Sequence, residues 1–196
     1  TGGVKLTPLQ RDGWRYPHVA VDLDRQAGTA AITVSGPAAV PTDLHAEGDA
    51  SWLLATTREL DDAILRLRAN ELEIGTWLLR TAGDPATVAA YDEFLLAHRD
   101  DWLVTEIVGY YRRTLKRLDT TSRSLFALIE PGSCFAGTLA ELVMGPRLDQ
   151  RRVLLLAPDD IALVLTGGTR IDAVAATPRE VGVRVDDPDA GRPGTR

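Results

Sequence analysis

The chain has 196 residues, of which 44% are hydrophobic and 26% charged, and its formal net charge is −6. This length and hydrophobic share fit about one packed domain and argue against a wholly disordered chain. The acidic balance is not that of a nucleic-acid or anionic-membrane binder, and no apolar run reaches the roughly 20 residues of a membrane helix. The single cysteine, Cys134, excludes an intramolecular disulfide and a cysteine-rich zinc site. We therefore expect a cytoplasmic protein with no nucleic-acid or membrane partner.

The first third of the chain predicts a hairpin. Residues 1–17 are interrupted by proline and glycine and are expected to be irregular. Apolar and polar residues alternate over 18–23, and 29–34 is rich in β-branched residues, with a turn between the two runs. This pattern predicts two antiparallel strands. Residues 37–50 are typical of a loop.

A helix is expected next, capped by Thr56 or Thr57. Acidic residues such as Glu59 would lie in its first turns, and Leu60, Ile64 and Leu67 would form its buried stripe. Residues 74–79 then predict a buried strand, which ends in the loop 81–85. A long helical stretch over 86–118 is expected to break near residues 100–101.

Residues 125–129 predict another buried strand, which ends at a Pro-Gly turn and leads into a short helix from about Gly137 through Leu142. Strands that alternate with helices predict an α/β fold with a largely parallel sheet. Ligands of such sheets bind at the carboxyl ends of the strands. The loops 81–85 and 130–138 are therefore the candidate ligand-binding loops.

The turn at 130–138 is the most informative stretch for chemistry. Small residues there let a ligand approach the backbone, and amides at a helix start can stabilise an oxyanion such as a thioester enolate. Glu141, about one turn into the helix, would then act as a base or acid. The alternative is an ordinary strand-to-helix turn with a solvated Glu141, and from spacing alone this alternative is favoured.

Five segments make the sequence recognisable. It resembles the benzoyl-CoA-dihydrodiol lyases, a family of the crotonase (enoyl-CoA hydratase) superfamily, over residues 5–142. The matching segments are KLTPLQRDGWRYP (5–17), TRELDDAI (57–64), EIGTWLLRT (73–81), LAHRD (96–100) and SRSLFALIEPGSCFAGT (122–138).

The resemblance implies a crotonase-like fold of stacked ββα units and a coenzyme A thioester substrate. The family reaction opens the ring of an oxygenated benzoyl-CoA derivative and releases formate. No metal or redox cofactor is implied, since coenzyme A is part of the substrate. We also expect a homo-oligomer.

The resemblance also implies site residues. The thioester oxygen would be held by two backbone amides, one at Gly137 or Thr138 and one in the loop from Thr81 to Asp84. Glu141 matches one of two catalytic glutamates of enoyl-CoA hydratases, whereas the second cannot be placed. The expected catalytic residues are Glu141 and Gly137; those expected to bind substrate are Thr81, Gly83, Asp84, Gly132, Ala136 and Thr138.

After Leu142 the family pattern ends. None of the four Trp, four Tyr and three Phe lies beyond Phe135, so the composition changes nearby. We divide the chain into a partial crotonase-like domain (1–142) and an atypical segment (143–196). Short strands can form in the atypical segment, with a hairpin-like turn between 161–165 and 171–175, and its end from 186 is expected to be disordered. This segment is either a genuine replacement that folds as extra strands or the product of truncation or a shifted reading frame.

Several other residues have simple structural interpretations. Cys134 is expected to be a packing residue, and Trp52, Trp77 and Trp102 are expected in the core. A basic cluster is expected to be a solvated helix face, with contact to coenzyme A phosphates or to a partner subunit as the alternative; it consists of Arg112, Arg113, Lys116 and Arg117.

Two functions remain open. The first is a crotonase-type lyase that acts on a dihydrodiol or epoxide derived from benzoyl-CoA. The second is a catalytically inactive, truncated module that binds coenzyme A thioesters or assembles with other subunits.

Overall fold

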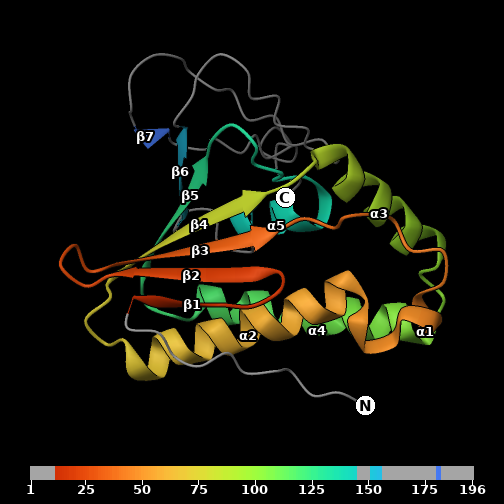
Figure 1. Ribbon diagram of the computed structural model, residues 1–196, viewed down its shortest axis with the longest axis horizontal. Helices are drawn as coiled ribbons and strands as arrows, with labels where there is room; N and C mark the ends of the chain where they lie inside the picture. Colours follow the sequence, from red (N-terminus) through yellow and green to blue (C-terminus); the bar gives the residue numbers. More distant parts are fainter. Residues whose placement is uncertain (1–11, 145–150, 156–179, 182–196) are drawn as a thin grey trace, which may run out of the picture.

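The computed structural model describes residues 12–144, 151–155 and 180–181 (Figure 1). Within them one sheet holds the strands β1 (Gly13–Arg15), β2 (Val19–Asp24), β3 (Thr29–Ser35), β4 (Thr76–Ala82), β5 (Ser124–Ile129), β6 (Arg151–Leu155) and β7 (Glu180–Val181), in that order. The helices are α1 (Leu44–Glu47), α2 (Trp52–Asn70), α3 (Pro85–Ala97), α4 (Trp102–Asp119) and α5 (Gly137–Met144), with a short 3₁₀ turn, η1 (Gly48–Ala50).

The predicted hairpin is confirmed as β2 and β3, which pair antiparallel with Val19 opposite Val34. Alternate residues of β3, among them Ile32 and Val34, are buried, as the alternating pattern requires. The structure adds a short strand, β1, to the edge of β2. The sequence did not predict it, because only three residues pair and one of them is Gly13. A Cβ at Gly13 would lie 2.0 Å from the carbonyl oxygen of Val21, so this close approach needs glycine.

The predicted parallel strands are also confirmed. β3, β4, β5 and β6 pair in parallel, and β7 returns antiparallel to β6. Helix α2 connects β3 to β4, and α3 and α4 connect β4 to β5. The α/β class follows from these crossovers, because parallel neighbours must be joined by long connections. β6 lies in the segment after Leu142, where short strands were expected to be able to form but the residues 151–155 were not singled out.

The expected start of α2 is wrong. The helix begins at Trp52, four residues before Thr56, and Thr56 and Thr57 lie buried inside it. Trp52 is buried and its indole N–H donates to the carbonyl oxygen of Ser35 at 2.9 Å, which fixes the start of the helix ahead of the expected capping residues. Glu59 consequently lies well inside the helix rather than in its first turn.

The expected break of the long helical stretch is confirmed between α3 and α4. Asp101 caps α4 by accepting from the amide of Leu103 at 2.7 Å. His98 ends α3, and its Nδ1 lies 2.8 Å from the carbonyl oxygen of Phe94. Helix α1 and η1 occupy part of the predicted loop 37–50.

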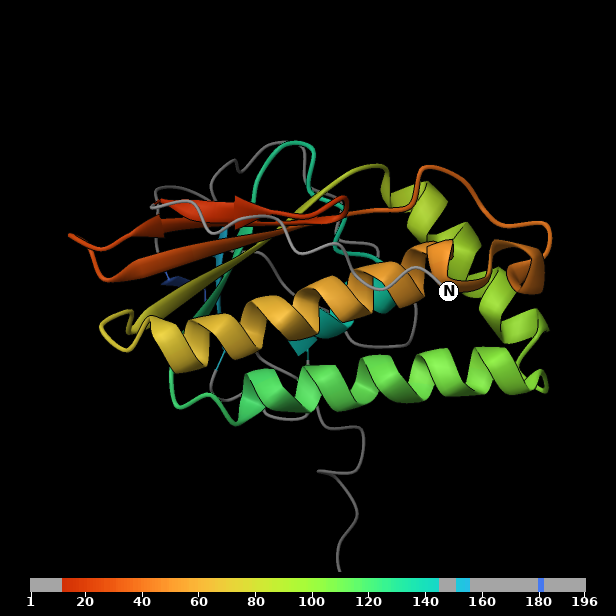
Figure 2. The same ribbon diagram turned by 60° about the horizontal axis from the view of Figure 1, so that its bottom comes forward.

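Helices and sheet form two layers. Figures 1 and 2 show α2 and α4 running along one face of the sheet, with α1 and α3 at one end of the molecule. Trp52 and Trp77 are buried in the layer between them, as expected. The expectation for Trp102 is wrong: it is 67% exposed at the first position of α4, where it meets the ring of His45.

The part of the chain that is described holds no helix with the length and apolar character needed to cross a bilayer. The predicted hairpin at 161–175 and the predicted disordered end lie outside the described residues.

Candidate functional site

The two candidate ligand-binding loops lie together at the carboxyl ends of β4 and β5. The amide of Gly83 donates to the carbonyl oxygen of Gly132 at 3.1 Å, and the amide of Cys134 donates to Oγ1 of Thr81 at 2.9 Å. Parallel strands place successive loops at one edge, which is why residues about fifty positions apart meet here. These two hydrogen bonds hold the loop after β4 against the loop after β5.

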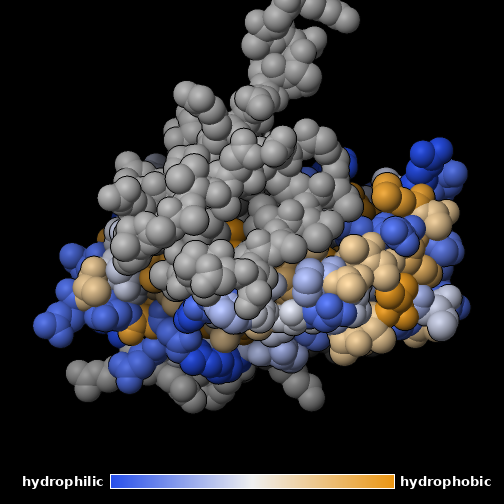
Figure 3. Space-filling view, turned by 90° about the horizontal axis from the view of Figure 1, so that it is seen from above, coloured by the Kyte–Doolittle hydropathy of each residue, from blue (hydrophilic) through white to orange (hydrophobic). Residues whose placement is uncertain are grey.

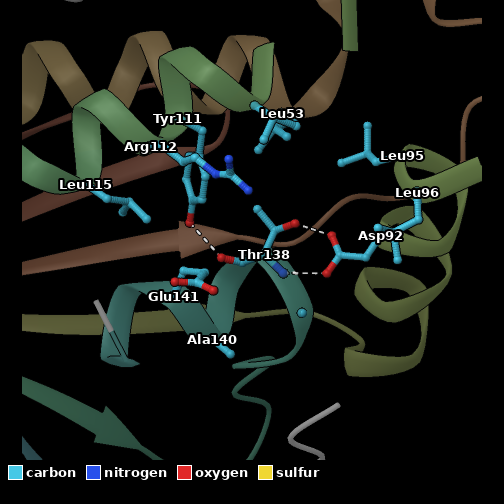
Figure 4. A pocket seen from close by; sticks show the side chains of 12 residues that line it. Leu53, Asp92, Leu95, Leu96, Tyr111, Arg112, Leu115, Thr138, Ala140 and Glu141 are labelled. Carbon is cyan, nitrogen blue, oxygen red and sulfur yellow. Dashed lines mark hydrogen bonds between the residues drawn. The ribbon is translucent and has the colours of Figure 1, made fainter. Parts of the chain in front are cut away.

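A cavity of about 400 Å³ lies beside this edge, between α3, α4 and the start of α5 (Figure 4). Three of the expected site residues line it: Gly137, Thr138 and Glu141. Thr81, Gly83, Asp84, Gly132 and Ala136 are not among its lining residues. The full lining is Leu53, Asp92, Leu95, Leu96, Val108, Tyr111, Arg112, Leu115, Gly137, Thr138, Ala140 and Glu141.

A carboxylate already occupies the start of α5. The amide of Thr138 donates to Oδ2 of Asp92 at 2.5 Å, and the Thr138 hydroxyl bonds to the other carboxylate oxygen. Gly137 has a φ of 45°, and a Cβ there would lie 1.6 Å from the same Oδ2. The Asp92 carboxylate therefore lies directly against the turn that was expected to hold a thioester oxygen.

Thr138 is held from a second side. Tyr111 of α4 donates from its hydroxyl to the carbonyl oxygen of Thr138 at 2.8 Å. Figure 4 shows Asp92 and Tyr111 reaching Thr138 from different helices. The amide, hydroxyl and carbonyl of this one residue are thus all fixed by side chains of α3 and α4.

Comparison with known proteins identifies a relative. The chain is 49% identical over 150 residues to the benzoyl-CoA-dihydrodiol lyase of Aromatoleum evansii. The chain therefore resembles a segment of benzoyl-CoA-dihydrodiol lyase. The match covers 72% of this chain and 27% of that lyase.

Two solved structures also match. They are an enoyl-CoA hydratase of Geobacillus kaustophilus HTA426, with 14% identity and a TM-score of 0.43, and a protein of Streptomyces coelicolor A3(2) described as an enoyl-CoA hydratase, with 13% identity and a TM-score of 0.41. The matches cover 73% and 76% of this chain, and 50% and 53% of the solved chains. No family model matches the chain.

The cavity of this lyase-like segment contains two carboxylates. Burial raises the pKa of Asp92, and the negative charge of Glu141 raises it further, whereas the hydrogen bonds from Thr138 lower it. Glu141 is exposed and was predicted here. Asp92 was missed, because it lies 46 residues before Thr138 and no local motif surrounds it. Only the packing of α3 against α5 reveals it.

Asp84, one of the expected substrate-binding residues, has a structural role. Its carboxylate caps α3 by accepting from the amides of Ala86 and Thr87 and from the Thr87 hydroxyl. These bonds, with the Thr87 hydroxyl the largest contributor, lower the pKa of Asp84. The side chain of Asp84 is thus committed to its own helix.

Cys134 is buried, as expected of a packing residue. Burial raises the pKa of its thiol, which disfavours the reactive thiolate. Its Sγ would lie 3.2 Å and 3.4 Å from a Cβ placed at Gly36 and Gly83, so it fills the space between β3 and the loop after β4.

The residues of the basic cluster on α4 have different surroundings. Arg112, Arg113 and Lys116 are exposed, and Arg112 also lines the cavity. Arg117 instead pairs with Asp61 of α2. Within the described residues, His, Cys, Asp and Glu side chains form no group of three or more suited to a metal ion.

Proposed function

We propose that this chain is part of a crotonase-type lyase that opens the ring of a dihydrodiol or epoxide derived from benzoyl-CoA. The observation that carries the proposal is the shared cavity: α5 presents Glu141 and the Gly137–Thr138 turn to the same space. Sequence identity of 49% to a benzoyl-CoA-dihydrodiol lyase supports the substrate class. The chain spans only 27% of that protein, so the activity of the whole protein is part of the proposal.

The turn at the start of α5 would hold the thioester oxygen. Amides at a helix start point outward and favour negative charge, which develops on this oxygen when the thioester forms an enolate. The donor at this turn would be the amide of Gly137 or of Thr138, and the Thr138 amide is bonded to Asp92 in this structure. A second amide from residues 81–84 would complete the site; the Gly83 amide is bonded to Gly132 in this structure.

Glu141 would be the acid or base. Its position one turn into α5, at the exposed side of the cavity, lets it exchange protons with solvent. The apolar side chains of Leu53, Leu95, Val108 and Leu115 line the same cavity and suit the ring-bearing acyl group.

The test measures two quantities on the purified chain: binding of benzoyl-CoA and release of formate from the dihydrodiol thioester. We expect both in the unmodified protein. The variant Glu141→Gln should retain binding but lose about 100-fold or more in kcat/KM, the usual contribution of a general acid or base. The matched control is Glu106→Gln, which changes an exposed carboxylate of α4 that does not line the cavity.

The outcomes separate the two candidate functions. Binding without formate release rejects the lyase and leaves the thioester-binding module. Absence of binding at millimolar benzoyl-CoA rejects both. Formate release that survives Glu141→Gln unchanged rejects the role of Glu141.

A further inference from the structure

The contact between Asp92 and the start of α5 has two consequences for a ligand. The carboxylate accepts a hydrogen bond from the Thr138 amide, and its Oδ2 occupies the space where a Cβ of residue 137 would be. An oxygen acceptor that used the Thr138 amide would occupy the position of Oδ2 itself, about 3 Å from the nitrogen. Asp92 and a thioester oxygen therefore cannot use this amide at the same time.

The same cavity also contains a cationic side chain. Arg112 lines the cavity from α4, and Figure 4 shows its side chain extending into it. A guanidinium group can bind a carboxylate with two parallel hydrogen bonds. In the proposal below, Arg112 would receive the Asp92 carboxylate after the carboxylate leaves the start of α5.

The electrostatics of the occupied position are mixed. The helix start and the two Thr138 donors favour the charged carboxylate, whereas burial and the charge of Glu141 oppose it. The hydrogen bonds that hold the charged Asp92 carboxylate are therefore offset in part by its burial and by the charge of Glu141. A contact that is offset in this way can be displaced by a ligand that binds the open state better.

We propose that Asp92 is an internal ligand of the α5 start that keeps the thioester site closed until an incoming thioester carbonyl displaces it. This inference rests on the proposed function, because it takes the thioester as the displacing ligand. Only molecules in which Asp92 has left the start of α5 can bind, so the apparent affinity equals the intrinsic affinity multiplied by the fraction of open molecules.

The first test is binding of benzoyl-CoA to four proteins by titration calorimetry: the unmodified chain, Asp92→Ala, Asp92→Asn and Glu93→Gln. Removal of the internal ligand should strengthen binding about tenfold in Asp92→Ala, which corresponds to a closed fraction of about nine in ten. Asp92→Asn keeps an acceptor without the charge, so its gain should be smaller. Glu93→Gln, an exposed neighbour on α3, should bind like the unmodified chain.

The second test needs no ligand. Hydrogen exchange at the Thr138 amide, followed by NMR, should be about tenfold faster or more in Asp92→Ala, and unchanged in Glu93→Gln. Circular dichroism of each variant shows that it is folded. Asp92→Asn serves for both tests if Asp92→Ala does not fold.

The results separate the two proposals. Unchanged or weaker benzoyl-CoA binding in Asp92→Ala overturns the internal-ligand proposal while leaving the proposed function intact. Absence of binding in all four proteins rejects the thioester function, and with it the displacement. Unchanged exchange at Thr138 overturns the closed contact itself, whatever the ligand.

Discussion

At the scale of single residues, Gly137 meets two constraints at once. Its φ of 45° lies in the left-handed region, and the Asp92 carboxylate fills the space where a Cβ would be. We expect Gly137→Ala to lower the free energy of unfolding by about 2 kcal/mol or more, because backbone strain and the displaced carboxylate both contribute. Urea unfolding measures the loss.

The control for this substitution is Gly28→Ala. Gly28 also has a positive φ, 66°, but a Cβ there would meet only the carbonyl oxygen of Glu73 at an ordinary 3.6 Å, so backbone strain should dominate. The double variant Gly137→Ala/Asp92→Ala should recover part of the loss at Gly137. A double variant that recovers nothing would contradict the close contact with Asp92.

Glu59 gives a second prediction, on pH dependence. Glu59 is only 4% exposed, and its carboxylate accepts a hydrogen bond from the backbone amide of His18 at 2.8 Å. Burial raises the pKa of Glu59 above its ordinary value of 4.5. For a raised carboxyl pKa, the stabilising contribution is complete below about pH 4.5 and is lost as the pH rises through the folded-state pKa. The variant Glu59→Gln has no titrating group at this position, so it does not lose stability in this pH range.

The free energy of unfolding of Glu59→Gln, relative to the unmodified chain, should therefore increase between about pH 4 and pH 7. Urea unfolding at both pH values measures it. Glu73→Gln, at an exposed position, is the control and should show no such trend. A relative stability that falls with pH would mean that the amide bonds of Glu59 outweigh its burial.

At the residue scale, the sequence grouped candidate residues whose signal is local. Gly137, Thr138 and Glu141 belong to one short motif, and the structure places all three on the cavity wall, whereas Gly132 and Ala136 of the same motif do not line it. Their roles in binding and catalysis stay predictions. Asp92 carries no motif, and Trp102 looks like a core residue until the start of α4 places it at the surface. Both depend on how helices pack, which a single sequence does not encode locally.

At the scale of secondary-structure elements, α2 and α4 are joined by an ionic contact. Arg117 pairs with Asp61, whose side chain is only 13% exposed, and the Tyr110 hydroxyl donates to the same carboxylate at 3.3 Å. We expect Arg117→Gln to lower the free energy of unfolding by about 1 kcal/mol, since it leaves a largely buried carboxylate with a weaker partner. Thermal unfolding measures the change.

Lys116→Gln is the matched control on the neighbouring, exposed position of the same helix. It removes the same charge without touching Asp61 and should change stability by less than about 0.5 kcal/mol. Equal effects of the two substitutions would show that overall charge, rather than the contact with α2, sets the stability.

Element-scale prediction was accurate where periodicity and caps agree. The strands around 18–34, 74–79 and 125–129 and the break before Asp101 were all indicated by such signals. The start of α2 was not, because burial of Trp52 decides it, and the capping threonines that seemed to mark it are instead buried in the helix. Strand β6 pairs with β5 in a stretch where the family pattern has ended, so short strands were allowed there but the bounds of β6 were not predicted.

At the scale of the whole molecule, the helix layer and the sheet layer contribute differently to the candidate site. Helices α2 and α4 cover one face of the sheet along its length (Figure 2), and Figure 3 shows apolar side chains gathered at the end of the molecule where α3 lies. Leu96 of α3, 69% exposed, contributes to the apolar cavity lining as well. The site is thus built from the helices at one end of the sheet, while the strands supply the buried centre.

This arrangement predicts a gradient of stability across the sheet. β3 and β4 lie between strands on both sides and bury Ile32 and Trp77 completely, whereas β1 is an edge strand with three paired residues. Amides of β3 and β4 should exchange only when the whole fold opens, and those of β1 through local opening. Hydrogen exchange read by mass spectrometry over 13–15 and 76–82 tests this directly. Equal protection of the two segments would mean that β1 unfolds only together with the centre of the sheet.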